Sequence, residues 1–251
     1  MKKIILSILL LVSVFGYCQS TSQNIIQMTY VRVDQKDFEE FESRELNHWS
    51  KVSESAIKNG DQVIWAFFRL VNSQMIEDQT MPTHVFVNIY KDFNQMNNAA
   101  QTVWGKSEEI LGMNPNLVST GDLSHTMMVQ VYKIVDNIPG SDFKFAVWNY
   151  SKPKNLSGFI DENLKLWKPY FQKKVGNDGF SGWGIAARVY PQGMDESSVI
   201  SWDHYSTLDA AMKALSPTDY DQSILSKSKM SEYDPNGFRY RVLVELLKIN
   251  R

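Results

Sequence analysis

The sequence predicts an α+β fold built from two tandem β-α-β-β-α-β units that pack sheet against sheet within one chain. Three observations predict it. Apolar and aromatic residues recur at a spacing of roughly 115 residues, both halves show the same order of strand and helix patterns, and the predicted strands carry bulky residues on both faces. An uncovered sheet face of that kind would expose an apolar patch that soluble monomers rarely tolerate, so we expect each half to cover the other.

The repeat keeps its alignment through both halves. A Phe, a Leu five residues on and a Trp three further occur as Phe41-Leu46-Trp49 and again as Phe159-Leu164-Trp167. A second tryptophan follows at the same distance in each half, at Trp65 and Trp183. Beyond a loop of different length, the sequence aligns Tyr90 with Tyr205 and Lys133-Ile134 with Lys248-Ile249. A series that stays aligned over both halves predicts a duplicated unit.

The spacing of apolar residues divides each half into strands and helices. Phe38, Phe41, Trp49 and Val52 lie on one side of a predicted helix over residues 37–58, which ends at Asn59-Gly60. The other elements expected in the first half are strands at 25–33, 63–71, 84–90 and 126–135 and a helix at 94–111. The second half repeats the order, with strands at 144–150, 181–190, 199–205 and 238–249 and helices at 156–174 and 208–232, the last divided by Pro217.

Residues 1–18 are typical of a secretory signal peptide, because a basic start is followed by an apolar run over 4–15 and by small residues at a cut site. Cys18, the only cysteine in the sequence, is either the last residue before cleavage or a site of lipid attachment. We expect cleavage, because Tyr17 stands where a lipoprotein signal usually has Gly, Ala or Ser. The protein is then exported, to the periplasm or outside the cell, and divides into a first repeat, 19–136, and a second repeat, 137–251.

The composition is that of an ordinary globular protein, with 251 residues of which 43% are hydrophobic and 22% charged. The net charge of −2 argues against nucleic acid as a partner, because phosphate binding needs a basic face. After the N-terminal segment no apolar run approaches the roughly 20 residues needed to cross a bilayer, so no membrane-spanning segment is expected in the mature chain. The oligomeric state is left open.

The two β-α-β-β-α-β units resemble the ferredoxin-like units of the dimeric α+β barrel superfamily, in a fused, tandem form. The resemblance covers nearly all of residues 25–249 and rests on the element order and the duplication, with no single member family matched. That superfamily includes cofactor-independent monooxygenases of the antibiotic-biosynthesis type, haem-degrading enzymes, and muconolactone-isomerase-like and EthD-like proteins. The resemblance implies a ligand cavity between the helices and the sheet.

Two polar residues occupy the same place in the two predicted helices. Glu45 lies four residues from both Phe41 and Trp49, and its counterpart in the repeat is Asn163. Side chains at this place would line a cavity between helix and sheet, where burial would raise the pKa of Glu45 and suit it to acid or base catalysis. Alternatively, Glu45 bends to solvent or to a nearby arginine. His48 lies one helical turn from Glu45, so the two are the candidate catalytic pair.

A second group of candidates lies on the strands of the second half. Ser201, Asp203 and Tyr205 alternate on one face of a strand, and we expect them to line a pocket with Arg188 from the neighbouring strand. The further candidates for ligand contact are Trp65, Trp104, Trp202 and His204. The alternative interpretations are a buried Asp–Arg pair or an exposed sheet edge for Asp203, and ordinary core packing for the tryptophans.

We therefore expect an exported protein that binds a small apolar or aromatic molecule between its helices and its sheet, without a metal or a cofactor. No paired-histidine metal motif, phosphate-binding loop or nucleophile elbow occurs in the sequence. One alternative is a cofactor-independent monooxygenase or isomerase that uses Glu45 and His48. The others are a structural or partner-binding module and a protein that holds haem through His48.

Overall fold

The structure is a computed structural model, and it describes residues 24–71, 80–140, 142–216 and 221–251. The predicted signal peptide, Cys18 and Pro217 lie outside the described residues. Within the described part, no helix is both long enough and apolar enough to cross a membrane.

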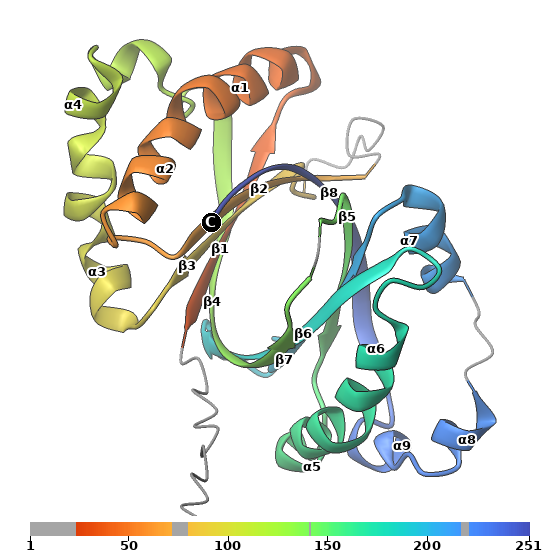
Figure 1. The fold of residues 1–251 in the computed structure, drawn as a ribbon. Helices are drawn as coiled ribbons and strands as arrows, with labels where there is room; N and C mark the ends of the chain where they lie inside the picture. Colours follow the sequence, from red (N-terminus) through yellow and green to blue (C-terminus); the bar gives the residue numbers. More distant parts are fainter. Residues whose placement is uncertain (1–23, 72–79, 141, 217–220) are drawn as a thin grey trace, which may run out of the picture.

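In the described residues, eight antiparallel strands close into a barrel in the order β1-β3-β2-β8-β5-β7-β6-β4 (Figure 1). The strands of the first half are β1 (Ile25–Val33), β2 (Ile64–Leu70), β3 (His84–Tyr90) and β4 (Ser124–Ile138). Those of the second half are β5 (Phe145–Ser151), β6 (Phe180–Tyr190), β7 (Val199–Tyr205) and β8 (Phe238–Asn250). All eight strands lie within three residues of the bounds that the sequence predicts.

Each half contributes four neighbouring strands to this barrel, in the matching orders β4-β1-β3-β2 and β8-β5-β7-β6. The two edge strands of one half pair with the two edge strands of the other, β2 with β8 and β4 with β6. The predicted fold, two ferredoxin-like units forming an intramolecular α+β barrel, is therefore confirmed. The closure also removes the unpaired edges that an isolated four-stranded sheet would present.

The helices lie outside the barrel, those of the two halves on opposite sides (Figure 1). The helices of the first half are α1 (Phe38–Arg44), α2 (Ser50–Lys58), α3 (Phe93–Thr102) and α4 (Ser107–Leu111). Those of the second half are α5 (Leu156–Glu162), α6 (Lys168–Lys174), α7 (Leu208–Leu215), α8 (Gln222–Leu225) and α9 (Met230–Tyr233). The predicted helix at 94–111 is thus interrupted after Thr102, and β4 ends at Ile138, three residues beyond its predicted end at 135.

A π-helical turn joins the first two helices of each half at the same place in the repeat. It spans Glu45–Trp49 between α1 and α2, and Asn163–Trp167 between α5 and α6. π-Turns are rare and are frequent at functional sites. Both turns begin at the polar residue of the apolar stripe, Glu45 or Asn163, so the duplicated sequence preserves a specific irregularity along with the general fold.

Apolar residues from both halves fill the interior of the barrel. The larger of these buried residues include Ile26, Met28, Tyr30, Phe68, Val85, Tyr132, Trp148, Tyr150, Ile200, Val244 and Leu246. The hydroxyls of Tyr30 and Tyr150, from the first strands of the two halves, are hydrogen-bonded to each other. Burying these surfaces against each other supplies the shared core that the duplication predicts.

The strand register corrects one part of the sequence alignment. Ile25 in β1 pairs with Lys133 in β4, whereas the equivalent first residue of β5, Phe145, pairs with Glu245 in β8. Lys133 therefore corresponds to Glu245 and not to Lys248. The sequence alignment is therefore wrong by three residues in the last strand of the repeat. Both pairings contain a register shift at the same place, after Tyr30 in one half and after Tyr150 in the other, so this bulge is common to the two halves.

Candidate functional site

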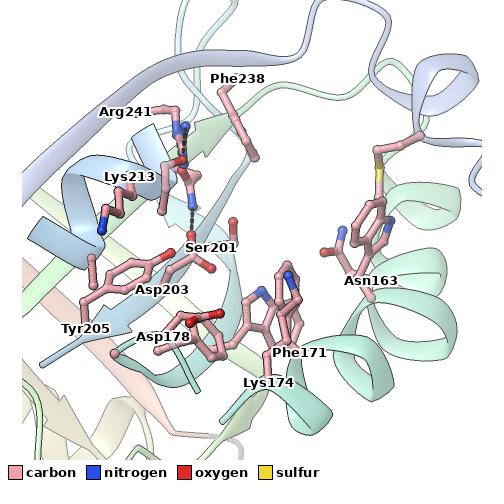
Figure 2. A pocket seen from close by; sticks show the side chains of 18 of the residues that line it. Asn163, Phe171, Lys174, Asp178, Ser201, Asp203, Tyr205, Lys213, Phe238 and Arg241 are labelled. Atoms are coloured by element: carbon pink, nitrogen blue, oxygen red, sulfur yellow. Dashed lines mark hydrogen bonds between the residues drawn. The ribbon is translucent and has the colours of Figure 1, made fainter. Parts of the chain in front are cut away.

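A cavity of about 960 Å³ lies between the helices and the outer face of the sheet in the second half. Its lining comes from the helical segment 159–174, the turn 177–179, the segment 206–214, the chain between α7 and β8, and strands β5 to β8. Figure 2 shows side chains from the helices and from the sheet pointing toward this space. The position agrees with the cavity that the resemblance implies.

One wall of the cavity is aromatic. The ring of Phe171 on α6 stacks on Phe180 and Trp183 of β6, with ring centres 5.7 and 5.9 Å apart and interplanar angles of 29° and 22°. On its own helix it stacks on Trp167, four residues earlier, at 6.0 Å. Phe159 and Phe238 also line the space. This wall offers flat apolar surfaces against which a planar molecule can stack.

The floor of the cavity is polar and consists of three hydrogen-bonded side chains on adjacent strands. Arg241 in β8 donates from Nε to Oδ1 of Asn149 in β5 at 2.7 Å. Asn149 in turn donates from Nδ2 to Oδ2 of Asp203 in β7 at 2.7 Å (Figure 2). Asn149 lies directly opposite Arg241 on one side and Ser201 on the other, so these residues share the face that meets the helices.

Asp203 is the ionisable group of this floor with the most strongly altered acidity. Its side chain is buried, and this burial raises the pKa of its carboxyl to about 6, although the hydrogen bond from Asn149 and the charge of Arg241 both act to lower it. The carboxyl therefore changes protonation near neutral pH. Such a group in an apolar cavity is suited to proton transfer or to hydrogen bonding with a bound molecule.

Asn163 lies in the helical wall facing the floor. It begins the π-turn of the second half, and its Nδ2 donates to the backbone carbonyl of Phe159 at 2.9 Å. Figure 2 shows its amide group pointing into the cavity. Of the residues that the sequence predicts to line a pocket, Asn163, Ser201, Asp203 and Tyr205 line this cavity.

The equivalent space in the first half is occupied by aromatic rings. Phe86 stacks on Phe67 with ring centres 5.0 Å apart, and it lies within 6.3 Å of both Phe41 and Trp65. Phe86 corresponds to Ser201, because the two residues take the same place in β3 and β7 relative to Tyr90 and Tyr205. A phenyl ring thus stands where the second half has a hydroxymethyl group and a cavity.

Glu45 is buried in this packed first half. It accepts a hydrogen bond from the Thr120 hydroxyl at 2.7 Å, and desolvation raises the pKa of its carboxyl to about 7. The alternative that Glu45 bends to solvent or pairs with an arginine is therefore wrong. His48 is half-buried on the same π-turn, and the described structure contains no hydrogen bond between it and Glu45.

Trp65 and Trp104, predicted for ligand contact, belong to the core of the first half. Trp65 is 1% exposed among Phe41 and Phe67. Trp104 packs edge-on against Trp49 with ring centres 6.3 Å apart. Core packing, the alternative stated for these tryptophans, accounts for both positions.

Arg188, Trp202 and His204 lie on the barrel side of the second sheet and do not line the cavity. Arg188 donates to Glu196 at 2.8 Å and to Ser197 at 2.6 Å and lies over the ring of Tyr132. His204 stacks on Phe143 with ring centres 3.7 Å apart. Because successive residues of a strand point to opposite faces, Asp203 faces the helices while Trp202 and His204 face the barrel.

The cation that the sequence interpretation missed is Arg241. It takes in the cavity the place that Arg188 was expected to take, and Asn149 connects it to Asp203. In the sequence, Arg241 is one of two arginines in the segment Arg239-Tyr240-Arg241, which resembles an exposed strand end. The sequence did contain one indication of its position. Arg241 lies two residues before Leu243, so both side chains point to the same face of the strand, and Leu243 packs in the core on the helix side.

No family model matches the chain, and no curated protein matches its sequence. Its fold is found in solved structures. A proposed monooxygenase from Fusobacterium nucleatum is 12% identical with a TM-score of 0.57, the match covering 92% of this chain and 95% of that one. A proposed monooxygenase from Lactobacillus acidophilus is 8% identical with a TM-score of 0.51, covering 91% and 96%.

Chlorite dismutases share the fold as well. A variant from Candidatus Nitrospira defluvii, solved in complex with cyanide, is 11% identical with a TM-score of 0.51, and the match covers 90% of this chain and 92% of that one. The fold is therefore that of the dimeric α+β barrel proteins, with both units in one chain. At these identities the likeness establishes the fold.

The expectation that the protein uses no cofactor is wrong as it stands, because chlorite dismutases are haem-binding proteins and have this fold. Haem iron is commonly held by histidine. The four histidines of the sequence all lie in the described residues, at positions 48, 84, 125 and 204, and none lines the cavity. The cavity therefore does not fit a histidine-ligated haem. Within the described residues, no group of three or more His, Cys, Asp or Glu side chains is placed to hold a metal ion.

Proposed function

We propose that the protein binds a small, flat, apolar or aromatic molecule in the cavity of its second half. The observation that carries the proposal is the combination of an aromatic wall with a hydrogen-bonded polar floor around about 960 Å³ of space. Pockets for small molecules generally have roughly 300–1,000 Å³, mostly apolar walls and a few convergent polar groups. The wall would stack on the body of the ligand, while the floor would orient its polar substituent.

The comparison with the first half supports the same proposal. A duplicated unit can fill this space with phenyl rings, as Phe86 and Phe67 do. The second half instead has Ser201 and a row of polar side chains that are difficult to bury without a partner. This arrangement costs stability, and ligand binding is a function that would maintain it.

We also propose that the protein acts after export. The support is the N-terminal sequence, in which Met1-Lys2-Lys3 precedes the apolar run 4–15 and the cut site near Cys18. The N-terminal sequence of the protein recovered from its producing cells tests this directly. A mature chain that begins at Gln19 supports cleavage, and a chain that retains Met1 contradicts export by this route.

The binding proposal is tested by filling the cavity with the side chain that the first half uses. Ser201→Phe places a ring at the position equivalent to Phe86. Calorimetric titration with 1-naphthalenemethanol, a neutral aromatic probe, is expected to show binding to the wild type and at least tenfold weaker binding to this variant.

The matched control changes the other half. Phe86→Leu removes a ring at the equivalent position outside the cavity, so its affinity for the probe should equal that of the wild type. Unchanged affinity in Ser201→Phe, with thermal unfolding like that of the wild type, would place binding elsewhere. Native mass spectrometry of the protein from its own cells then identifies any retained molecule by its mass.

The second candidate function is an enzyme of the oxygenase or isomerase kind, and the observation that favours it is Asp203. A buried carboxyl with a pKa of about 6 at the floor of an apolar cavity can transfer a proton to or from a bound substrate. Among the structural neighbours are proposed monooxygenases. If the recovered molecule is a substrate, the wild type will convert it, and Asp203→Asn will bind it without conversion. Equal conversion by the variant would remove this role from Asp203.

A further inference from the structure

The cations of the cavity differ in how their charge is compensated. Lys213 on α7 is paired with Asp209 at 2.8 Å, and both side chains are exposed. Lys174 lies over the ring of Tyr170 at 4.6 Å on the exposed side of α6. Arg241 is half-buried on the sheet floor and thus differs in position from both lysines.

In the part of the chain that the structure describes, Arg241 has only uncharged partners, which are the ring of Phe238 at 5.5 Å and two hydrogen-bond acceptors. Its Nε donates to the Asn149 amide oxygen at 2.7 Å, and its Nη1 donates to the backbone carbonyl of Ala214 at 3.2 Å. Among the described residues, no carboxylate oxygen lies within 4 Å of its guanidinium. A partly buried cation gains most from a hydrogen-bonded anion, and here the protein itself provides none in direct contact.

We infer that the ligand of this cavity is an aromatic acid, whose carboxylate binds the guanidinium of Arg241 while its ring stacks on the wall formed by Trp167, Phe171 and Trp183. The inference rests on the proposed function and adds the chemical class of the ligand. Arginine is suited to this role, because its planar fork can donate two parallel hydrogen bonds to a carboxylate. The helical wall lies across the cavity from Arg241 (Figure 2), so one flat molecule can contact both.

Asp203 completes the recognition of an acid. A ligand carboxylate beside Arg241 also lies near Asp203, because only the side chain of Asn149 separates the two residues. A second negative charge raises the pKa of Asp203 further above its value of about 6, so its carboxyl takes up a proton from solvent. The protonated carboxyl can then donate a hydrogen bond to the ligand. Binding of an acid at pH 7 is therefore accompanied by proton uptake.

The cavity also contains acidic side chains, which would attract a cationic ligand. Their attraction for a cation is weaker than that of Arg241 for an anion. The titratable side chains that line the space together with Asp203 and Arg241 are Lys174, Asp178, Tyr205, Asp209, Lys213 and Asp234. Asp178 is exposed to solvent and Asp209 is already paired with Lys213. Burial raises the pKa of Asp234, which weakens it as a counter-charge.

The test compares three probes that share one ring system and differ in charge: 1-naphthoate, 1-naphthalenemethanol and 1-naphthylmethylamine. Calorimetric titration of the full-length protein at pH 7 and low salt is expected to give at least tenfold tighter binding for naphthoate than for the alcohol, and the weakest binding for the amine. Tighter binding of the amine, or equal binding of acid and alcohol, overturns the inference.

The variant Arg241→Gln separates recognition of the acid from the shape of the site. It should remove the preference for naphthoate while the affinity for the alcohol changes less than twofold, and Arg241→Lys should retain part of the preference. A parallel loss for acid and alcohol would mean that Arg241 only supports the structure of the cavity, which contradicts the inference.

Proton uptake provides a readout that a purely structural role would not change. Naphthoate titrations in two buffers of different ionisation enthalpy should reveal uptake in the wild type and none in Asp203→Asn. Absence of uptake in the wild type contradicts the role of Asp203. The two proposals fail in different ways. If neither naphthoate nor the alcohol binds the wild type, the binding function itself is wrong, whereas binding of the alcohol without preference for the acid removes only the ligand class.

Discussion

The two halves of this protein have the same strand order and the same pair of π-turns, but they use the space between helices and sheet differently. In the first half this space contains the stacked rings of Phe67 and Phe86. In the second half the position of Phe86 is taken by Ser201, and a cavity of about 960 Å³ is present. The comparison shows that the two copies of a duplicated fold can differ, with stacked aromatic rings in one and a cavity in the other.

The polar floor follows the same division. The residues that correspond in the strand register to Arg241 and Asn149 are Val129 and Thr29, and Asn88 corresponds to Asp203. The first half therefore has no charge at any of these three positions. Since the backbone pairing is the same, the difference between a packed core and a candidate binding site depends on a few side chains.

The largest expected difference between the halves is the loss of stability when the equivalent residues Phe41 and Phe159 are each replaced by alanine. Phe41→Ala removes a side chain that is 0% exposed inside packed rings, and we expect it to cost about 4 kcal/mol of the free energy of unfolding. Phe159→Ala enlarges a space that already exists, so we expect a loss of about 2 kcal/mol. Urea unfolding followed by circular dichroism measures both. Equal losses would mean that the second half is packed as tightly as the first.

Glu45 provides a difference in pH dependence between the halves. Its pKa in the folded protein, about 7, is above its ordinary value of 4.5, so the stability associated with its protonated form is fully present below pH 4.5 and is lost as the pH rises to 7. Relative to Glu45→Gln, the wild type should lose about 3 kcal/mol between pH 5 and pH 8. The second half has Asn163 at the equivalent position, so its π-turn contributes no such change.

Urea unfolding of both proteins over this pH range measures the effect. Gln can still accept the Thr120 hydrogen bond, so the variant changes the charge and little else. The exposed Glu108→Gln on α4 is the control and should follow the wild-type curve. Parallel curves for the wild type and Glu45→Gln would show that Glu45 does not titrate in this range.

A smaller effect is expected from the partner of Glu45. Thr120→Val removes the hydroxyl that donates to the carboxylate, which should cost about 1 kcal/mol at pH 8. Because this hydrogen bond lowers the pKa of Glu45, the loss of stability with rising pH should extend to higher pH in the variant. The control is Thr102→Val, whose hydroxyl donates only to a helix carbonyl at 3.2 Å. An unshifted transition in Thr120→Val would contradict the assignment.

The sequence predicts the architecture well because its determinants are local and repeated. The spacing of Phe41, Trp49, Phe159 and Trp167 defines the helices, and bulky residues on both strand faces indicate that each sheet has two covered sides. The order of strands and helices then follows from the alternation of patterns. The π-turns were not predicted, because a one-residue shift in backbone hydrogen bonding leaves no signature in composition.

The candidate site was predicted in part, and the reason lies in the strand faces. Asn163 and the row from Ser201 to Tyr205 line the cavity, but Arg188, placed with them from the sequence, points into the barrel. When a strand carries apolar residues on both faces, the alternation of its side chains does not show which face points to the helices, so the face of a single arginine cannot be assigned. Arg241 was missed because its neighbour across the sheet, Asn149, is known only from the pairing of β5 with β8.

The closure of the barrel through the pairs β2–β8 and β4–β6 has a consequence for how the protein can be divided. A polypeptide cut between Ile138 and Phe145 would yield two fragments. Each would have two unpaired edge strands and one exposed apolar sheet face. Neither fragment would be stable as a monomer in water. The two fragments would have to reassociate with each other, or each would have to form a dimer with a second copy of the same fragment. The intact chain needs no second molecule, because each of its two sheets is covered by the other sheet of the same chain.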